Sequence, residues 1–484
     1  MSKICWSIEA YLISETKTLG SVVLISALIV VLGTCVCFLY APDLKSAVST
    51  PDQKLTAVKR IFGLRALEVR EYAQDPLFLL GQALFFDPII SGNRTTSCAS
   101  CHLLSKGLTD GRPVRGVYEI LKTRSNDTGK TYNSYRLRNA LDLWNRDANP
   151  VRALFWDGRV EALDPTRNTF RSPLGSQLPF GFKNILEIQS LFPIATDDEM
   201  IGHAGDRSPD SLPPPHSHRV NELAPPVQGS VSADQILAIH KKLMVRLLGS
   251  ETPREPWQEK YRKLFLTAFP DRAINDMGMV QFGASIAHFE ELAFSANGAR
   301  WDRYLAGQAD ALTDAEKRGA LLFYGRGGCV TCHSGPLLSD FQFQGIGIFS
   351  LQVEINNELL EDLGRFAVTG NDADLYKFRT PPLRNVTKTV PYFHDGSSTT
   401  LEDALRRHVD PISYNRIYRR NGSALMDKAH VGSIAPIVLS TSPPSGNELA
   451  EIAAFLRTLD SQSRKTEEII PTSVPSGLPI NGVR

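Results

Sequence analysis

Hydrophobic positions along the chain first mark an N-terminal membrane-spanning segment. Leu19–Tyr40 forms an uncharged apolar run that is long enough to cross a bilayer as a helix. We interpret residues 18–41 as a signal anchor, preceded by a short cytoplasmic tail at 1–17 and followed by a linker at 42–69. A cleaved signal peptide and lipidation of Cys35 are the alternatives, but the residues after the run offer no small-x-small cleavage pattern and those before Cys35 fit a lipidation motif poorly.

The hydrophobic pattern after this segment contains an internal repeat. "DPLFLLGQALFFDPIISGNRTTSCASCH" and "LTDAEKRGALLFYGRGGCVTCH" share one order of features. Each has an amphipathic helix containing Gly81 or Gly319, an aromatic end, a glycine-bearing loop and a C-x-x-C-H pentapeptide. In the second copy, Thr313 and Glu316 form a capping-box pattern that starts the helix. The repeat predicts two related helical domains.

Four of the seven cysteines fall in the two pentapeptides, which are the attachment signature of a c-type haem. The thiols bond the porphyrin vinyl groups, and the adjacent imidazole reaches the iron. The residues concerned are Cys98, Cys101 and His102 in the first motif and Cys329, Cys332 and His333 in the second. A redox dithiol or half a zinc site is the alternative for each motif, but neither pair has a second C-x-x-C at finger-like spacing. The pattern therefore predicts two covalently bound haems.

The helical patterns around the motifs predict a mainly α fold: two tandem cytochrome c-like haem domains behind the N-terminal transmembrane helix. The N-terminal haem domain covers 70–300, and the segment from Ile236 to Arg303 is helix-rich and includes the bridge to the next domain. The C-terminal haem domain covers 301–460, and apolar spacing predicts a closing helix from Leu449.

Two segments are predicted to lack regular structure. Residues 206–230 are dense in proline and serine, so we interpret them as an insertion that forms a surface loop. Its His216 and His218 are then solvated side chains, with a metal site as the alternative. The last residues, 461–484, are predicted to form a flexible tail.

Composition sets the broad class and the compartment. The chain has 484 residues, 42% hydrophobic content and a formal net charge of +1, which fits a globular protein and argues against a nucleic-acid partner. Covalent haem attachment takes place on the outer side of an energy-conserving membrane. We therefore expect the body of the protein to lie at the periplasmic face of the inner membrane, held there by the N-terminal helix.

Four motifs together resemble the bacterial dihaem cytochrome c peroxidase family, which includes the MauG-like protein-oxidising enzymes. They are "LFFDPIISGNRTTSCASCH", "FWDGR", "GCVTCHSGPLLSD" and "LRNVTKTVPYFHDGSSTTLEDAL", in the family's order and over about 70–460. The resemblance implies that His102 and His333 are the proximal iron ligands. It also implies that the N-terminal haem reacts with peroxide, while the C-terminal haem holds or delivers electrons.

The residues on the distal side of the first haem follow from the resemblance. Some family members carry a removable distal histidine after the first motif, but here no histidine occurs between His102 and His203. We therefore expect an open first haem. Glu199 matches the family's distal acid and would move protons during peroxide cleavage, and Gln189 matches its distal glutamine. The alternative for Glu199 is a capping box with Thr196.

Three further predictions concern the region between the haems and the second haem. Trp156 of "FWDGR" falls where the family places an electron-relaying tryptophan; a core aromatic is the alternative. Family members carry methionine or tyrosine fourteen residues after the "PYFHDG" histidine, His394, but here that position is His408. Leu401, Ala404, Leu405 and His408 share one helical face, and Arg406 and Arg407 are expected to point away from it. We predict His333/His408 ligation, with a core histidine as the alternative, and a potential below that of a His/Met haem.

The resemblance also implies a calcium site between the haems. Asn139, Thr389 and Pro391 match the positions concerned, the last two through backbone carbonyls.

The predicted function is peroxide-dependent oxidation at the N-terminal haem, with electrons passing through the C-terminal haem. The electron source is a periplasmic donor, or a protein or organic substrate in the MauG-like case. The alternative is a membrane-anchored dihaem electron-transfer cytochrome without peroxidase activity, in which Tyr118 or His203 would supply a sixth ligand to the first haem.

Overall fold

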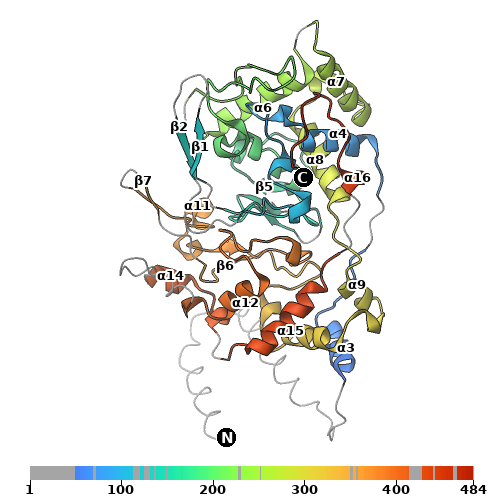
Figure 1. The fold of residues 1–484 in the computed structure, drawn as a ribbon, viewed down its shortest axis with the longest axis vertical. Coiled ribbons are helices and arrows are strands. Elements are labelled where there is room, and N and C mark those ends of the chain that lie inside the picture. The colour runs from blue at the N-terminus through green and yellow to red at the C-terminus, as the bar shows by residue number, and fades with distance from the viewer. Residues whose placement is uncertain are drawn as a thin grey trace, which may run out of the picture. The chain divides into compact units, whose positions relative to one another are not determined.

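Helices carry most of the regular structure in the computed structural model (Figure 1). The structure describes residues 50–68, 72–112, 120–124, 131–135, 138–148, 151–164, 166–226, 231–250, 252–348, 353–355, 358–413, 428–439, 442–461 and 466–482. Contacts divide the chain into Met1–Gln53 and one compact unit, Lys54–Arg484, which the following paragraphs describe. The mainly helical prediction is confirmed.

The longer helices are α3 (Pro51–Ile61), α4 (Pro76–Phe86), α6 (Ala233–Leu248), α7 (Pro256–Ala268), α8 (Met279–Ala293), α10 (Asp314–Tyr324), α12 (Leu401–Val409) and α15 (Gly446–Arg457). The short ones are α5 (Ile185–Gln189), α9 (Arg300–Leu305), α11 (Phe366–Thr369), α14 (Lys428–Ser433) and α16 (Thr466–Ile469). The capping box of Thr313 and Glu316 is present at the start of α10, and the helix predicted from Leu449 is α15.

The predicted membrane helix at 18–41 lies outside the described residues. Over the part of the chain that the structure does describe, none of the helices is both long enough and apolar enough to span a bilayer.

The strands are short and form small antiparallel sheets. β3 (Ala153–Leu154), β4 (Val160–Asp164) and β5 (Thr169–Arg171) form a three-stranded sheet in that order. Two hairpins join β1 (Ile120–Arg124) to β2 (Thr131–Tyr135) and β7 (Val353–Ile355) to β8 (Glu358–Leu360). A further antiparallel pair joins β6 (Phe343–Gln344) to β9 (Phe378–Arg379), which are not consecutive along the chain. The three-stranded sheet flanks the "FWDGR" motif, so it fixes Trp156 between the two halves of the unit.

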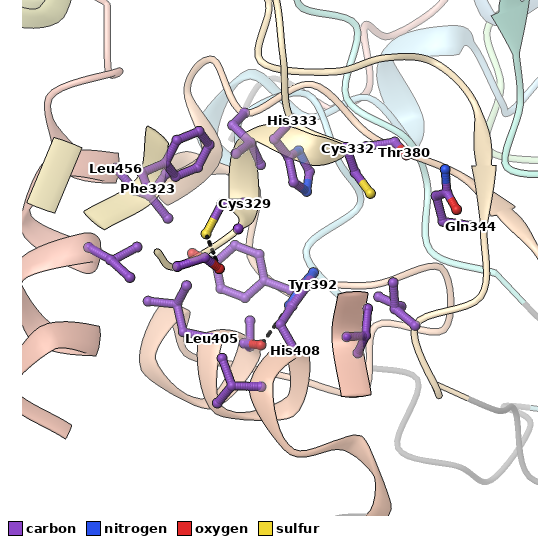
Figure 2. A pocket seen from close by; sticks show the side chains of 18 of the residues that line it. Phe323, Cys329, Cys332, His333, Gln344, Thr380, Tyr392, Leu405, His408 and Leu456 are labelled. Atoms are coloured by element: carbon purple, nitrogen blue, oxygen red, sulfur yellow. Dashed lines mark hydrogen bonds between the residues drawn. The ribbon is translucent and has the colours of Figure 1, made fainter. Parts of the chain in front are cut away.

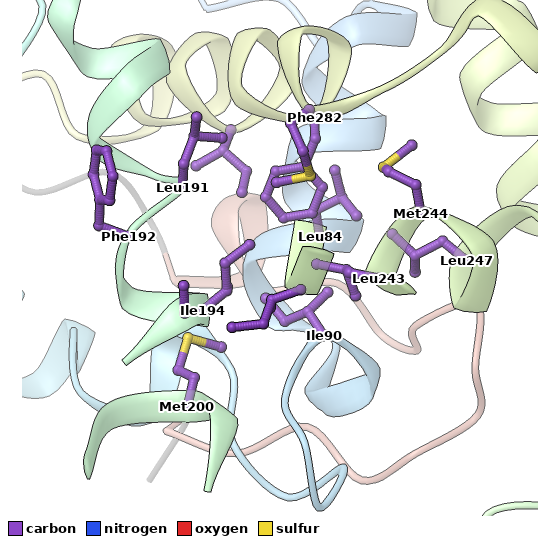
Figure 3. Close-up of a cluster of buried hydrophobic side chains, with 14 of the residues drawn as sticks. Leu84, Ile90, Leu191, Phe192, Ile194, Met200, Leu243, Met244, Leu247 and Phe282 are labelled. Carbon is purple, nitrogen blue, oxygen red and sulfur yellow. The ribbon is translucent and has the colours of Figure 1, made fainter. Parts of the chain in front are cut away.

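Each half has its own hydrophobic core. The first is built from α4 to α8 and the loops between them; Figure 3 shows Leu84, Leu191, Leu243 and Phe282 meeting at its centre. The second is built around α10, α12 and α15. A third cluster of aromatic side chains, including Phe85 and Phe289, packs behind the first C-x-x-C-H motif.

The repeat seen in the sequence is a repeat of helix packing. α4 packs on α8, and α10 packs on α15. A Cβ atom added at Gly81 would lie 2.0 Å from the carbonyl oxygen of Ser285, and one at Gly319 would lie 1.9 Å from that of Glu451. Both glycines are therefore required because the backbones of the paired helices touch there.

Residues 466–482 pack against the first domain, which corrects the predicted flexible tail at 461–484 over its described part. Ile469, Val474 and Leu478 are buried. Ser476 Oγ donates to Asp87 Oδ1 (2.6 Å), and Asn481 Nδ2 donates to Thr95 O (2.6 Å), close to the first haem motif. The segment is polar and rich in proline, so its few buried apolar residues were not recognised in the sequence.

This C-terminal segment also changes the environment of α4. The sequence predicts an amphipathic helix, but α4 is buried on most of its surface. The amide of Gln82 donates to Ile469 O (2.8 Å), so the segment covers the face that would otherwise meet water.

The proline-rich insertion at 206–230 is a loop in its described part, but the prediction of solvated histidines holds for only one of the two. His218 is exposed and pairs with Asp210 (3.2 Å). His216 is buried, with its Nε2 3.0 Å from Ser476 O and its ring against Trp257. The C-terminal segment buries His216, and this contact between distant residues could not be predicted from the local sequence.

Candidate functional site

The two C-x-x-C-H motifs adopt the same local structure. Each begins with a 3₁₀ turn, Cys98–Ser100 or Cys329–Thr331. His102 N donates to Cys98 O (3.0 Å), and His333 N donates to Cys329 O (2.9 Å). All four cysteines are free thiols and partly buried. Burial raises the pKa of Cys329 to about 11, so this thiol is protonated at neutral pH.

A backbone carbonyl orients each motif histidine. His102 Nδ1 lies 2.9 Å from Leu108 O, and His333 Nδ1 lies 3.0 Å from Leu338 O. A carbonyl only accepts, so Nδ1 carries the proton and the Nε2 lone pair is left for a metal. Burial lowers the pKa of both rings, that of His333 to about 4, which keeps them neutral as metal ligation requires.

The orienting leucines were missed in the sequence, although a signal exists. Leu108 and Leu338 both have positive φ, of 68° and 54°, which turns their carbonyls toward the histidines. The two positions read L-T-D and L-S-D, five or six residues after the motif histidine. The repeat thus extends beyond the pentapeptide into the loop that follows it.

An apolar cavity of about 220 Å³ lies beside the second motif. Cys329, Cys332 and His333 line one side, and His408 of α12 lies on the opposite side (Figure 2). Nδ1 of His408 is 2.8 Å from Ala404 O, so its Nε2 lone pair is also free for a metal. Burial lowers the pKa of His408. The predicted helix and the predicted convergence of His333 and His408 are both present.

The spacing of the two imidazoles fits a single iron between them. A metal–imidazole bond is about 2 Å long and the ring centre lies about 1 Å beyond the nitrogen, so two rings on one ion have centres about 6 Å apart. The centroids of His333 and His408 are 6.4 Å apart. A core histidine pair in van der Waals contact would not require this gap, so the residues present fit a haem.

The neighbours of His408 on α12 divide as the helical face predicts, with one correction. Leu401 and Ala404 are buried, and Arg406 is exposed. Arg407, expected to point away from the core, is also buried, but its Nε pairs with Asp403 Oδ2 (3.0 Å). Its charge is therefore neutralised along its own helix.

Buried arginines beside the cavity fit an anionic cofactor. Arg379 lines the cavity and is 1% exposed, and its guanidinium bonds only to carbonyl oxygens in the described hydrogen bonds, with Nη2 left unpartnered. Burial, with the nearby positive charge of Arg146, lowers its pKa to about 9. Arg146 Nη2 donates to Asp142 Oδ2 (2.7 Å), but its buried Nη1 is unpartnered. One carboxylate between two buried cations leaves an excess of positive charge that suits the propionate groups of a haem.

Trp156 lies between the two halves of the unit. Its ring lines the cavity, and its Nε1 donates to Asn139 O (2.9 Å) in the segment that follows the first motif along the chain. His394 is edge-on to it at 6.3 Å and stacks on Phe378 at 3.6 Å. Trp156 is therefore a buried aromatic that touches the cavity of the second motif and hydrogen-bonds toward the first.

The rest of the "FWDGR" motif joins the halves electrostatically. Asp157 Oδ2 accepts from Arg138 Nη1 (2.6 Å), and the same guanidinium forms a two-point bond to Asp362 at 2.6 and 2.8 Å. These two acids raise the pKa of Arg138, so it stays charged although it is half-buried. The ion pairs hold Trp156 in register with the second motif.

Two of the three residues predicted for calcium meet. Asn139 Nδ2 donates to Pro391 O (2.6 Å), while Asn139 Oδ1 is buried without a partner. The Thr389 hydroxyl donates to Val386 O (2.9 Å). The described residues hold no group of three or more His, Cys, Asp or Glu side chains arranged around a metal ion.

The predicted distal residues belong to neighbouring turns of the first core. Gln189 ends α5 and is half-buried next to Ile188, while Glu199 is half-buried in a π-helical turn, Asp197–Ile201. The Thr196 hydroxyl donates to Phe192 O (2.9 Å), and Glu199 N donates to Thr196 O (3.3 Å). Most of the loop after the first motif, including Tyr118, lies outside the described residues.

Known proteins resemble this chain in sequence and in fold. The family model described as di-haem cytochrome c peroxidase matches residues 76–310. Cytochrome c551 peroxidase of Nitrosomonas europaea is 28% identical over 76% of this chain and 84% of its own length. Methylamine utilization protein MauG of Methylorubrum extorquens is 28% identical over 75% and 79%. The diheme peroxidase BthA of Burkholderia thailandensis shares the fold, with 22% identity, a TM-score of 0.53 and 86% and 94% coverage.

The fold, the paired motifs and these relatives define a mainly helical dihaem protein. More specifically, residues 76–310 match the model of the di-haem cytochrome c peroxidase family, and the curated relatives are named peroxidases and MauG proteins. The chain is therefore an oxidoreductase enzyme with haem cofactors, and the resemblance found in the sequence motifs is confirmed.

Proposed function

We propose that the protein reacts with hydrogen peroxide at the haem of His102 and passes electrons through a second haem held by His333 and His408. The observation that carries this proposal is an asymmetry between the two motifs. His408 faces His333 across the cavity, whereas the chain has no histidine between His102 and His203 that could close the first haem in the same way. The first haem is then open to peroxide.

Bound haems would supply the redox chemistry, since a ferric iron with a free coordination position can take up the oxidising equivalents of peroxide. Glu199 then accepts a proton from the near peroxide oxygen and returns one to the leaving oxygen. Gln189 orients the peroxide by hydrogen bonding through its amide. Cys98 and Cys101 hold the first haem covalently, and Cys329 and Cys332 hold the second.

The second site favours storage of oxidising equivalents. Two imidazole ligands give a lower potential than a histidine–methionine pair, which makes the second haem easier to oxidise. Trp156 lies between the sites and relays electrons. These features favour MauG-like oxidation of a protein or organic molecule over peroxidase action with a high-potential donor.

The remaining proposals concern surroundings. Haem attachment requires an oxidising compartment, so we place the body at the periplasmic face of the inner membrane, anchored through Leu19–Tyr40. The unpartnered Asn139 Oδ1 beside Pro391 O supports a calcium ion there, with Thr389 O as a third ligand.

Peroxide consumption by the haem-loaded protein tests the proposed function. Glu199→Gln keeps the size of the side chain but removes its basicity, so the rate of peroxide decay should fall by about 10²–10⁴-fold. Glu259→Gln, an exposed glutamate on α7, is the matched control and should leave the rate unchanged.

Two outcomes would contradict the proposal. If Glu199→Gln consumes peroxide at the parental rate, the carboxylate does not move the proton. If the parental protein carries both haems and consumes no peroxide, it is an electron-transfer cytochrome, with His203 the described candidate for a sixth ligand to the first haem.

A further inference from the structure

A second cavity lies between α6, α7 and the proline-rich insertion, and no residue of a C-x-x-C-H motif lines it. Its volume is about 540 Å³, within the usual range for small-molecule sites. It shares no lining residue with the cavity beside His333. We call it the basic cavity. Its charged lining consists of Arg94, Arg219, Lys241, Lys242, Arg246, Glu222 and Glu255.

The basic cavity has more positive than negative side chains. Five basic residues and two acids line it, and one of the acids is shared. Glu222 Oε1 accepts from Arg246 Nε (2.7 Å), and Glu222 also pairs with Arg94 Nη2 (3.4 Å). The second acid, Glu255, is 3.9 Å from Arg219. A net excess of three positive charges therefore remains.

Two buried donors in the walls lack an acceptor. Arg94 is 7% exposed and Trp257 is 9% exposed. Arg94 Nη1 and Trp257 Nε1 are both buried without a hydrogen-bond partner. An unsatisfied buried donor costs about 1–3 kcal/mol, more for a charged group, so a nearby pair is unusual without a ligand that accepts from them.

Mutual repulsion among the cations also favours an anionic ligand in the basic cavity. Burial and the charges of Arg246 and Arg219 lower the pKa of Arg94 to about 10, despite its contact with Glu222. Burial, with Arg94 and Arg219 nearby, also lowers the pKa of His216, so this ring is neutral at neutral pH. His216 adds no charge of its own and stacks at 5.4 Å against Trp257.

We propose that the basic cavity binds a small organic anion through its carboxylate or phosphate group. The oxyanion accepts from Arg94 and from the Trp257 indole, with Arg219 completing the charge balance at the exposed side. The carbon skeleton packs on the apolar part of the lining, which consists of Pro215, Val245, Pro253 and the ring of Trp257.

The position of the cavity links this ligand to the first haem motif. Arg94 lies in the loop that leads to Cys98, and Arg246 donates to the carbonyl oxygens of Ile89 (2.7 Å) and Ser91 (2.5 Å) in the same loop. Gly92 N in turn donates to Met200 O (2.9 Å), next to Glu199. A bound anion would therefore brace the loop between the attachment motif and the proposed distal acid.

Calorimetric titration of the haem-loaded protein tests the proposal. The probes are inorganic phosphate and succinate, and sodium chloride at matched ionic strength serves as the blank. We expect one phosphate or one succinate per chain. Binding of phosphate alone identifies a phosphate site, and binding of succinate alone identifies a carboxylate site; either supports the proposal.

Variants then locate the site. Arg219→Gln should weaken binding at least about tenfold by removing a charge-assisted contact. Trp257→Phe, which keeps the ring but removes the N–H, should weaken it by a few fold. Lys263→Gln on the exposed side of α7 is the control and should bind as the parent does.

Two results would overturn the proposal. One is that neither probe binds at concentrations up to about 10 mM, which is about ten times the concentration that saturates typical anion sites. The other is an equal loss in Lys263→Gln and Arg219→Gln, which would indicate general charge attraction. Arg94 is left unchanged in these variants because its loop leads into the haem motif and its replacement could disturb folding.

Discussion

His408 sets the chemistry of the second haem in this account. It occupies a position where family resemblance leads one to expect methionine or tyrosine, and it lies on the apolar face of α12 opposite His333. Its ring is oriented by a carbonyl of its own helix, so the ligand geometry depends on one element only. A change at this residue should therefore alter the cofactor without moving the fold.

His408→Met should raise the reduction potential of the second haem, on the order of 100 mV, because a thioether favours ferrous iron more than an imidazole does. Potentiometric titration followed by absorbance measures this shift. His430→Met is the control: His430 bonds Glu361 (2.7 Å) and does not line the cavity. An unchanged potential in His408→Met would show that His408 does not bind the iron.

Glu290 links the stability of the first domain to pH. Burial raises its pKa to about 8 from an ordinary 4.5, and its Oε2 has no partner. Between these two pH values the folded chain keeps a proton that the unfolded chain has released. The free energy of unfolding should therefore fall as pH rises from about 4.5 to about 8, by up to about 1.4 kcal/mol per unit from this residue.

Denaturant unfolding at several pH values checks this prediction. Glu290→Gln should flatten the dependence and unfold at higher denaturant than the parent at pH 8. Glu291→Gln is the control, because the side chain of Glu291 is 40% exposed. This variant should keep the parental dependence of unfolding free energy on pH. Identical slopes in the parent and Glu290→Gln would refute the assignment.

At the scale of elements, the two helix pairs carry the fold. α4 meets α8 and α10 meets α15 at glycines where backbone touches backbone. Each pair supports the turn that holds one C-x-x-C-H motif, so the same packing unit is used twice. Loss of this contact should affect stability and haem retention together.

Gly319→Ala places a methyl group within 1.9 Å of Glu451 O and should lower the free energy of unfolding by about 1–3 kcal/mol or more. Gly446→Ala tests the same pair of helices without a clash, because a Cβ at Gly446 meets no atom within 4 Å. Thermal unfolding of both variants distinguishes them. Equal stability of the two would mean that the helix contact tolerates a side chain.

Local patterns in the sequence were enough for the helices and for the convergence of His333 with His408. The capping box at Thr313 and the apolar face of Leu401 to His408 are short-range signals, and both lie where they were predicted. Burial by residues that are distant in the sequence left no such local signal. The burial of His216 by Ser476, and of α4 by Ile469, depends on contacts more than two hundred residues apart.

The same contrast holds for the site itself. Spacing identified the motif cysteines and histidines, but the buried arginines Arg146 and Arg379 are ordinary in sequence. They acquire meaning only because each has a buried guanidinium nitrogen without a partner. Leu108 and Leu338 act through their backbone carbonyls, and the identity of a side chain says little about where its carbonyl points.

For the whole molecule, ion pairs and Trp156 join two haem-bearing halves of unequal character. Arg138 bonds Asp157 in the first half and Asp362 in the second, and Trp156 touches the cavity from the same segment. In the proposed function, one half presents an iron site with an open face and the other a site closed by two imidazoles. The proposed reaction with peroxide depends on this inequality.

Electron paramagnetic resonance of the resting ferric protein, repeated after addition of hydrogen peroxide, tests that inequality most directly. We predict one high-spin and one low-spin haem, and the loss of both ferric signals with peroxide as oxidising equivalents spread over the two sites. Two low-spin haems that do not respond to peroxide would contradict the account and leave an electron-transfer cytochrome.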